Sequence, residues 1–228
     1  MSRQISRGTC VYCHNTYAGS GMSRHLKACQ ARREVIAGKE ARGAPKTQLF
    51  HLAVKGSYNP EYWLHLELPA QATLYDLDQF LRDIWLECCG HLSMFRIKDA
   101  MFMSTVFDDW WSDDEQDMGF KLGDVLVPGV EFSHEYDFGT TTYLTLRVVS
   151  ERQGIASQDE PIRILARNDP PDLRCETCDQ LATYICVFCD YTLLCDACIE
   201  THECGEEGLL PVVNSPRVGM CGYTGEAW

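Results

Sequence analysis

Thirteen cysteines, eleven of them in two terminal segments of this 228-residue chain, restrict its possible folds more than any other feature. The first residues, MSRQISRGTC, contain no apolar stretch that would serve as a secretion signal. No run approaches the roughly 18 apolar residues that a membrane-spanning helix needs. We therefore expect a cytoplasmic protein, in which thiols stay reduced. Cysteines at short spacings in that compartment indicate metal sites rather than a disulfide framework.

The C-terminal cysteines follow a linker, ARNDPPDLR, and begin with three Cys-x2-Cys pairs within twenty-four residues. Each pair can present two thiolates to one metal ion, and Zn²⁺ is the ion typical of such cysteine and histidine sets. Redox-active Cys-x2-Cys pairs are the alternative, but they require a thioredoxin-like setting that so short a segment lacks. The predicted ligands are Cys175, Cys178, Cys186, Cys189, Cys195, Cys198 and His202.

This spacing resembles that of B-box and MYND-type fingers, which hold two zinc ions in a cross-braced arrangement. The resemblance implies that the first and third pairs share one ion, while the second pair and His202 hold the other. Two cysteines are candidates for the eighth ligand, namely Cys204, which we prefer because it is nearer, and Cys221. Such modules bind proteins rather than catalyse reactions, because no coordination position is left open to a substrate.

A second zinc-binding pattern lies near the N-terminus, in CVYCHNTYAGSGMSRHLKAC. It resembles the two-Cys two-His finger family, with Cys in place of the last His and one residue fewer between the second and third ligands. Tyr17 and Met22 occupy the two positions that build the core of a ββα finger. Without metal, so short a segment could not bury enough surface to fold, and it would be a disordered basic tail. The predicted ligands are Cys10, Cys13, His25 and Cys29.

The two patterns together predict about three zinc ions, one N-terminal and two C-terminal. Cys88 and Cys89 fall at the end of an apolar helical pattern, outside both segments. We expect these two side chains to be free thiols.

The net charge of −13 is unevenly distributed along the chain. Residues 1–48 carry nine Lys/Arg against two Asp/Glu, a net charge of +7, whereas residues 168–228 carry two against eleven, a net charge of −9. Only the N-terminal arm can therefore attract a polyanion. A single finger reads only about three base pairs, so a protein contact or a solvated basic helix is an equally good interpretation. The candidate phosphate contacts are Arg24, Lys27, Arg32 and Arg33.

The middle of the chain changes to strand-like and helical patterns from residue 48. Strands are predicted at QLFHLAVKG, YWLHLEL, FRI, AMFMSTVF, VEFSHEYDFG and TYLTLRVVSE, and one long helix from Thr73 to Gly90. The predicted fold class is α+β, a central mixed domain with one long helix on an antiparallel-rich sheet, flanked by small zinc-stabilised modules. The predicted domains are residues 1–45, 46–168 and 169–228.

The helix exit CGHLSMF, the stretch KLGDVL and the hairpin FSHEYDFGTTTYLTLRVV resemble the plasmid pRiA4b ORF-3-like family. The resemblance covers residues 48 to about 152, and it implies an α+β fold and an association with plasmids and mobile elements. It implies no established reaction. Family members usually continue the Tyr-Asp-Phe-Gly motif with Asp, Trp and His, whereas this chain has threonines from Thr140 onward. No site is therefore carried over from the family.

These observations favour a modular interaction protein that binds a protein partner through the C-terminal module and nucleic acid or a protein through the N-terminal arm. The alternative is an enzyme of unknown chemistry with a site near His91, His134 and Asp137. No phosphate loop, nucleophile elbow or dinucleotide fingerprint specifies a reaction. His91 is expected to satisfy a helix C-terminus, and Asp137 is expected to be a turn residue. The acidic run DDWWSDDEQD, residues 108–117, is interpreted as a solvated loop.

Overall fold

The computed structural model describes residues 5–41, 43–105, 115–157 and 161–225. Residues 108–114 of the acidic run that we interpreted as a loop lie outside these residues, and its last three residues, Glu115–Asp117, form a strand instead of a loop. The chain divides into two compact units, each built from two separate stretches of sequence. Unit 1 comprises Met1–Phe80 and Leu92–Asp169, and unit 2 comprises Leu81–His91 and Pro170–Trp228.

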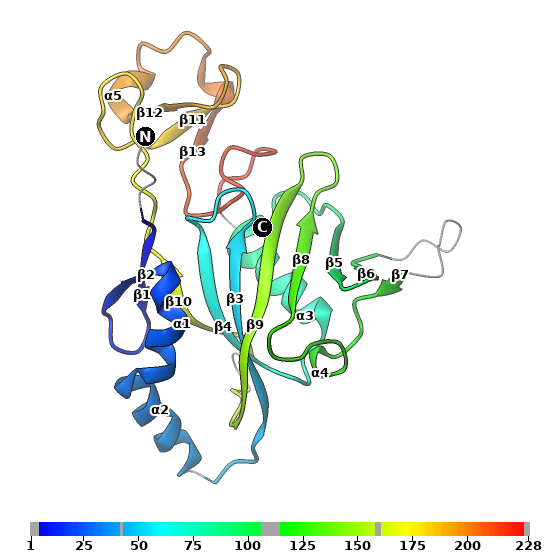
Figure 1. The fold of residues 1–228 in the computed structure, drawn as a ribbon. Coiled ribbons are helices and arrows are strands. Elements are labelled where there is room, and N and C mark those ends of the chain that lie inside the picture. The colour runs from blue at the N-terminus through cyan, green and yellow to red at the C-terminus, as the bar shows by residue number, and fades with distance from the viewer. Residues whose placement is uncertain (1–4, 42, 106–114, 158–160, 226–228) are drawn as a thin grey trace. The chain divides into compact units, whose positions relative to one another are not determined.

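Unit 1 is organised around a ten-stranded sheet (Figure 1). Its strand order is β2-β1-β10-β4-β3-β9-β8-β5-β6-β7, and every neighbouring pair is antiparallel except β6 and β7. The predicted mixed fold with an antiparallel-rich sheet is confirmed. The strands are β1 Arg7–Cys10, β2 Thr16–Ala18, β3 Thr47–Gly56, β4 Trp63–Pro69, β5 Ser93–Ile97, β6 Ala100–Met103, β7 Glu115–Asp117, β8 Glu131–Tyr136, β9 Thr142–Gly154 and β10 Arg163–Asn168.

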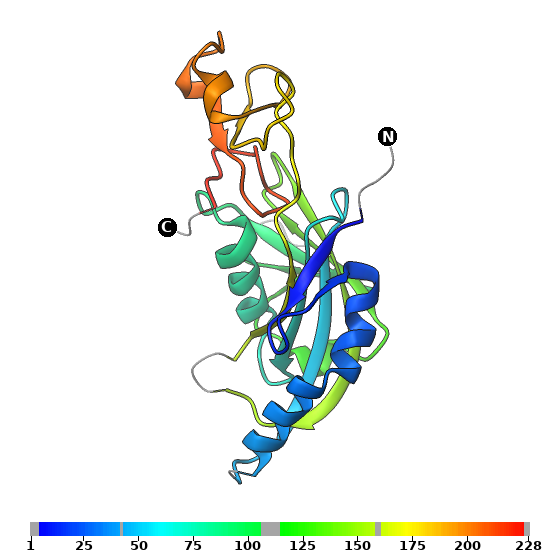
Figure 2. The same cartoon turned by 90° about the vertical axis from the view of Figure 1, so that its left-hand side faces the viewer.

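Helices cover both faces of this sheet (Figure 2). Helices α1 (Gly19–Ala28) and α2 (Gln30–Glu40) lie on one side, and α3 (Leu74–Leu81) lies on the other. The short helix α4 spans Leu122–Val125.

Strand β4 shows why both faces must be covered, because all seven of its residues are buried. Its alternation places Leu64, Leu66 and Leu68 on one face, each fully buried. Trp63, His65 and Glu67 occupy the opposite face and are also buried, at 5, 3 and 2% exposure. The polar face of this strand is therefore an interior surface that needs internal partners for its charged and hydrogen-bonding groups.

The finger segment continues the sheet rather than standing apart from it. Strand β1 pairs with β10, with Thr9 opposite Arg167. A side chain on Gly8 would meet the carbonyl oxygen of Arg167 and the Cα of Asn168, so the close approach of these strands requires glycine here. The predicted boundary at residue 45 falls between α2 and β3, inside unit 1.

The predicted long helix is shorter than expected and changes character before it ends. After α3 the chain forms one π-helical turn, Arg82–Leu86, in which the Glu87 amide donates to the Arg82 carbonyl. Glu87 is already extended, and its carboxylate pairs with the Arg82 guanidinium at 2.9 Å. The helical structure therefore ends at Leu86, and residues 88–90, which we predicted to be helical, lie beyond it.

Unit 2 contains little regular structure beyond that π-helical turn. Its three strands form a small sheet in the order β12-β11-β13. None of the helices in the described ranges is both long and apolar enough to cross a membrane. The elements are β11 Tyr184–Cys186, β12 Thr192–Leu194, α5 Asp196–Ile199, a 3-10 turn Glu206–Gly208 and β13 Leu209–Pro211.

Candidate metal centres

All thirteen cysteines, with three of the seven histidines, gather into four groups of four ligands. Within each group the potential ligand atoms lie within 4.8 Å of one another, and none of the thirteen cysteines forms a disulfide. We name the groups the finger cluster (Cys10, Cys13, His25, Cys29), the Cys198 cluster (Cys175, Cys178, Cys195, Cys198), the Cys204 cluster (Cys186, Cys189, His202, Cys204) and the Cys221 cluster (Cys88, Cys89, His91, Cys221).

The finger cluster is assembled by the β1–β2 hairpin and helix α1. Cys10 ends β1, and its amide and carbonyl hydrogen-bond to Asn15 and His14, which closes the turn that carries Cys13. His25 lies in the last turn of α1 with its Nε2 3.4 Å from Cys13 Sγ. Tyr17 stacks on the His25 ring, with ring centroids 3.8 Å apart.

The core of this finger merges with the sheet of unit 1. Met22 and Leu26 of α1 are buried together with Trp63 of β4 and Leu165 of β10. Tyr17 packs against the same group, so both predicted finger core positions contribute to it. Burial also raises the pKa of the Cys10 thiol, which favours the protonated form unless a cation compensates the charge.

The Cys198 cluster has the dimensions of a zinc site with four thiolates. Cys178 Sγ lies 3.5 Å from the Sγ atoms of both Cys195 and Cys198. Zinc–sulfur bonds of ≈ 2.3 Å in a tetrahedron place neighbouring sulfurs about 3.8 Å apart. Burial opposes ionisation of Cys175, but backbone amides lower the pKa of this thiol to about 6. A thiolate is the form that binds a metal ion.

The Cys204 cluster joins the second Cys-x2-Cys pair to the region after α5. Cys189 Sγ lies 3.4 Å from His202 Nε2, the same separation as in the finger cluster. Burial opposes ionisation of Cys186, but its contacts with His202 and Cys189 lower the pKa of the thiol to about 6. Cys204, the preferred eighth ligand, lies in this group, whereas the alternative Cys221 does not.

The Cys221 cluster was missed by our sequence analysis. We expected Cys88 and Cys89 to be free thiols outside any metal site, and the structure places them beside His91 and Cys221 as a possible fourth ligand set. Two sequence features could have indicated this site, namely the Cys-Cys-x-His sequence after the helix and the cysteine followed by glycine near the C-terminus. Their separation by 130 residues kept them from being read as one site.

The three residues considered for catalysis each make a different set of contacts. His134 and Asp78 are buried, with Nε2 and Oδ1 2.6 Å apart. Asp137 has a left-handed backbone, φ 65°, and its Oδ1 accepts hydrogen bonds from the amides of Gly139 and Thr140. The prediction of a turn residue is thus confirmed. His91 belongs to the Cys221 cluster, and its carbonyl accepts a hydrogen bond from Arg82.

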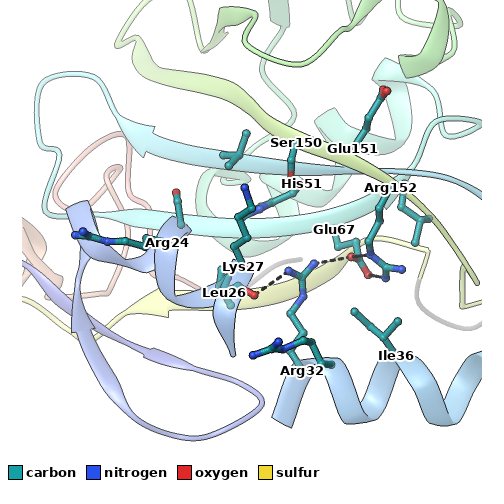
Figure 3. A pocket seen from close by; sticks show the side chains of 14 residues that line it. Arg24, Leu26, Lys27, Arg32, Ile36, His51, Glu67, Ser150, Glu151 and Arg152 are labelled. Carbon is teal, nitrogen blue, oxygen red and sulfur yellow. Dashed lines mark hydrogen bonds and ion pairs between the residues drawn. The ribbon is translucent and has the colours of Figure 1, made fainter. Parts of the chain in front are cut away.

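A separate pocket of about 620 Å³ lies in unit 1 between α1 and α2 and strands β3, β4 and β9 (Figure 3). Glu67 lies at its base and is ion-paired with Arg32, Arg152 and Arg163. Burial alone would raise the pKa of Glu67, but hydrogen bonding to Arg152 and the charges of the three arginines hold the pKa below its ordinary value. Glu67 is therefore an ionised, buried partner for three cations.

One of the predicted phosphate contacts is wrong for this reason. Arg32 is buried, donates to the Glu67 carboxylate at 2.8 Å and donates to the Leu26 carbonyl at 3.1 Å. The other three candidates, Arg24, Lys27 and Arg33, line the same pocket and are exposed.

Comparisons with known proteins assign neither a family nor a function to this chain. No protein-family model matches the chain, and no curated protein matches it. Among solved structures it is similar to a protein of unknown function from Methanosarcina mazei Go1, at 18% sequence identity and a TM-score of 0.41. That match covers 50% of this chain and 66% of the archaeal one, slightly less than two thirds.

Proposed function

We propose that this protein is a zinc-binding modular interaction protein of the cytoplasm, in which zinc shapes surfaces that bind other macromolecules. The observation that carries the proposal is the closed character of the predicted zinc sites. The finger, Cys198 and Cys204 clusters each supply four nitrogen or sulfur ligands, which is the full complement of a structural zinc ion. A catalytic zinc site keeps one position for water or substrate.

The surface around the C-terminal clusters supports a protein partner. Leu181, Phe188 and Tyr191 are 57, 63 and 52% exposed, and Phe188 lies between the ligands Cys186 and Cys189. Exposed aromatic side chains on a rigid support are typical of protein-binding surfaces. The net charge of −9 over residues 168–228 disfavours a phosphate backbone here.

Affinity capture with nuclease-treated lysate tests this proposal. The double variant F188S/Y191S should lose the partners that the full native chain retains, while its zinc content stays the same because neither side chain is a ligand. The matched control is Y58S, which removes an aromatic residue of unit 1 that is 82% exposed. Equal recovery of partners by all three proteins would contradict a binding role for this surface.

A nucleic-acid contact is the second candidate, and it rests on the basic side chains of the N-terminal arm. Arg24, Lys27 and Arg33 project from two consecutive helices and line one pocket. The arm has a net charge of +7 in an otherwise acidic chain. Phosphate contacts of this kind give binding that weakens with salt and shows little preference for sequence.

Fluorescence anisotropy with duplex DNA and single-stranded RNA at several salt concentrations tests the second candidate. R24A/K27A/R33A should remove most of the affinity, and each lost phosphate contact should reduce the slope of log K against log salt by about 0.9. The matched control is K55A/K98A/K121A, which removes the same charge from exposed lysines elsewhere in unit 1. If both triple variants bind like the native chain, the arm does not bind nucleic acid.

We also propose that residues 46–168 are related to the plasmid pRiA4b ORF-3-like family and share its association with mobile elements. The support is the Tyr-Asp-Phe-Gly motif, which begins at Tyr136 and forms the turn between β8 and β9. An alignment of relatives should retain Asp137 and Gly139, because the turn uses the carboxylate of one and the amide of the other.

A further inference from the structure

We infer that Cys88, Cys89, His91 and Cys221 form a fourth zinc site, which joins the helix exit of unit 2 to its C-terminal segment. This site is additional to the three predicted from the sequence. It does not depend on the proposed binding partners, because it concerns the metal content and folding of the chain itself.

The sulfur–sulfur distances in the Cys221 cluster are close to those of a tetrahedral zinc site, and its histidine nitrogen lies nearer to the sulfurs than the 3.4 Å of the finger and Cys204 clusters. Cys89 Sγ lies 3.6 Å from Cys88 Sγ and 3.9 Å from Cys221 Sγ, on either side of the tetrahedral spacing of about 3.8 Å. His91 Nε2 lies 2.9 Å from Cys89 Sγ and 3.2 Å from Cys221 Sγ. A point between these atoms can therefore be at bonding distance from three sulfurs and one nitrogen.

The first three ligands are held by hydrogen bonds that organise the helix exit. Arg82 donates to the Glu87 carboxylate at 2.9 Å and to the His91 carbonyl at 2.7 Å. Glu87 in turn accepts from the Gly90 amide at 2.6 Å. Gly90 has φ 75°, a conformation that lets the chain reverse between Cys89 and His91. Cys88 and Cys89 before this turn and His91 after it can therefore approach the same point.

The fourth ligand lies on a tight turn that is unusual for a cysteine. Cys221 has φ 47°, between Gly219 at φ 78° and Gly222 at φ 67°. The Tyr223 amide donates to the Met220 carbonyl at 2.8 Å, which closes the turn around Cys221. A non-glycine residue in this region costs energy and persists where the surroundings hold it. Ligation of a metal by its side chain would supply that restraint.

Further contacts within unit 2 hold the two segments together next to the cluster. The Ser215 hydroxyl donates to the Trp85 carbonyl at 2.6 Å, and the Trp85 indole donates to the Asn214 carbonyl at 3.1 Å. Arg217, which is fully buried, directs Nη2 to Cys88 Sγ at 3.3 Å. A guanidinium that donates to a metal-bound thiolate orients the ligand and balances part of its charge.

Three thiolates and one imidazole are a donor set typical of structural zinc. The site differs from the other three in exposure, since Cys89 and Cys221 are both exposed, whereas each other cluster contains at least one fully or nearly buried cysteine. We therefore expect the fourth ion to exchange fastest. Copper(I) is the competing soft cation, and metal analysis distinguishes the two.

The experiment is elemental analysis of the full chain, purified under reducing conditions without chelator. We expect about four zinc ions per chain in the native protein and in the control T224S, and about three in C221S. C221H should recover the fourth ion at least in part, because it replaces a sulfur ligand with a nitrogen ligand. Cobalt substitution should show tetrahedral thiolate bands that weaken by about a quarter in C221S.

Alkylation followed by mass spectrometry provides a second measurement on the same proteins. Cys88 and Cys89 should be protected in the native chain and modified in C221S, while Cys175 and Cys178 stay protected in both. Three zinc ions in the native chain together with rapid alkylation of Cys88, Cys89 and Cys221 would overturn the inference. A disulfide among these cysteines, or bound copper, would also overturn it. Fewer than three ions would instead count against the proposed zinc-binding function.

Discussion

The two units of this protein reach a stable interior by different means. Unit 1 buries long apolar side chains on a ten-stranded sheet, for example Leu52, Leu66, Leu144 and Leu146, which are all fully buried. In the C-terminal module of unit 2, the buried cluster consists of three cysteines, Cys175, Cys186 and Cys195, and one leucine, Leu194. The first interior consists of hydrocarbon side chains, and the second consists largely of cysteines that we predict to be metal ligands.

This difference shows what a short segment needs in order to fold. A chain of about sixty residues is only marginally stable by size, and this one has three-residue strands and a buried cluster with a single leucine to offset its conformational entropy. We expect metal coordination to supply the missing free energy. The finger is intermediate, since it has one Cys/His cluster but also packs Met22 and Leu26 against the sheet of unit 1.

Metal removal should produce the largest difference in stability between the two units. A strong chelator should unfold unit 2 outside its π-helical turn, because each structural zinc contributes on the order of 10 kcal/mol to folding. Amide hydrogen exchange should show β11 and β12 opening while β3 and β9 stay protected. Loss of protection in β3 and β9 at the same chelator concentration would contradict an independent hydrocarbon core in unit 1.

Within unit 1, the largest single-residue effect should come from Glu67, which is 2% exposed and pairs with three arginines. E67A would leave these cations without their common partner. Removing one partner of a buried ion pair costs about 3–5 kcal/mol, so we expect a loss of at least that size in the free energy of unfolding measured by urea denaturation. E67Q, the isosteric control, keeps the hydrogen-bond acceptor and should cost less. Equal losses for both variants would mean that charge is unimportant here.

A pH titration tests the buried pair His51 and His65, whose Nε2 and Nδ1 atoms lie 2.9 Å apart. Burial lowers the pKa of His51 to about 3 and that of His65 to about 4, with smaller contributions from neighbouring charge. The unfolded chain, with histidine pKa values near 6.5, therefore binds protons first as the pH falls. Stability is fully present above about pH 6.5 and falls progressively between there and about pH 3, the lower of the two folded-state pKa values.

The double variant H51L/H65L isolates this contribution. Urea denaturation of unit 1 should show a shallower dependence of stability on pH between about 4 and 6.5 than in the native chain. Acid releases zinc from the native chain and from H51L/H65L alike, so this effect cancels when their pH profiles are subtracted. Identical pH profiles would show that these histidines do not titrate between the folded and unfolded states.

The smallest predicted effect concerns the start of α3. Thr73 Oγ1 accepts from the Asp76 amide at 3.1 Å, and Asp76 Oδ2 accepts from the Thr73 amide at 2.8 Å. This is a reciprocal helix cap, and T73A should lower the free energy of unfolding by about 1 kcal/mol in thermal or urea denaturation. T73S should retain most of the stability. A loss in T73S as large as that in T73A would assign the effect to the methyl group instead.

The sequence predicted best those features that depend on residues near one another. The strand predicted at YWLHLEL, the helix start predicted at Thr73 and the turn predicted at Asp137 are local features, and each is present in the structure. The twelve preferred zinc ligands lie within two stretches of chain, residues 10–29 and 175–204, and the structure brings them into three groups of four. Short-range spacing is informative because a few backbone dihedral angles determine it.

Features that depend on distant segments could not be predicted in this way. The burial of Arg32 follows from Glu67, Arg152 and Arg163, which come from three different strands. The Cys221 cluster likewise needs the helix exit and the C-terminal segment to meet. The early end of the helix was missed because a π-helical turn has no clear sequence pattern of its own.

The pairing of β1 with β10 can form only after most of the chain has been synthesised. Thr9 hydrogen-bonds to Asp169, which is synthesised 160 residues later. At roughly 5–20 residues per second, the ribosome takes about 8–32 s to cover that distance. During this interval strand β1 has β2 on one side but no strand on the side that will face β10. All four ligands of the finger cluster have already been synthesised by then. An early supply of zinc would therefore order the hairpin while the edge of β1 that faces β10 is still unpaired, and this edge can pair with another chain until β10 has been made.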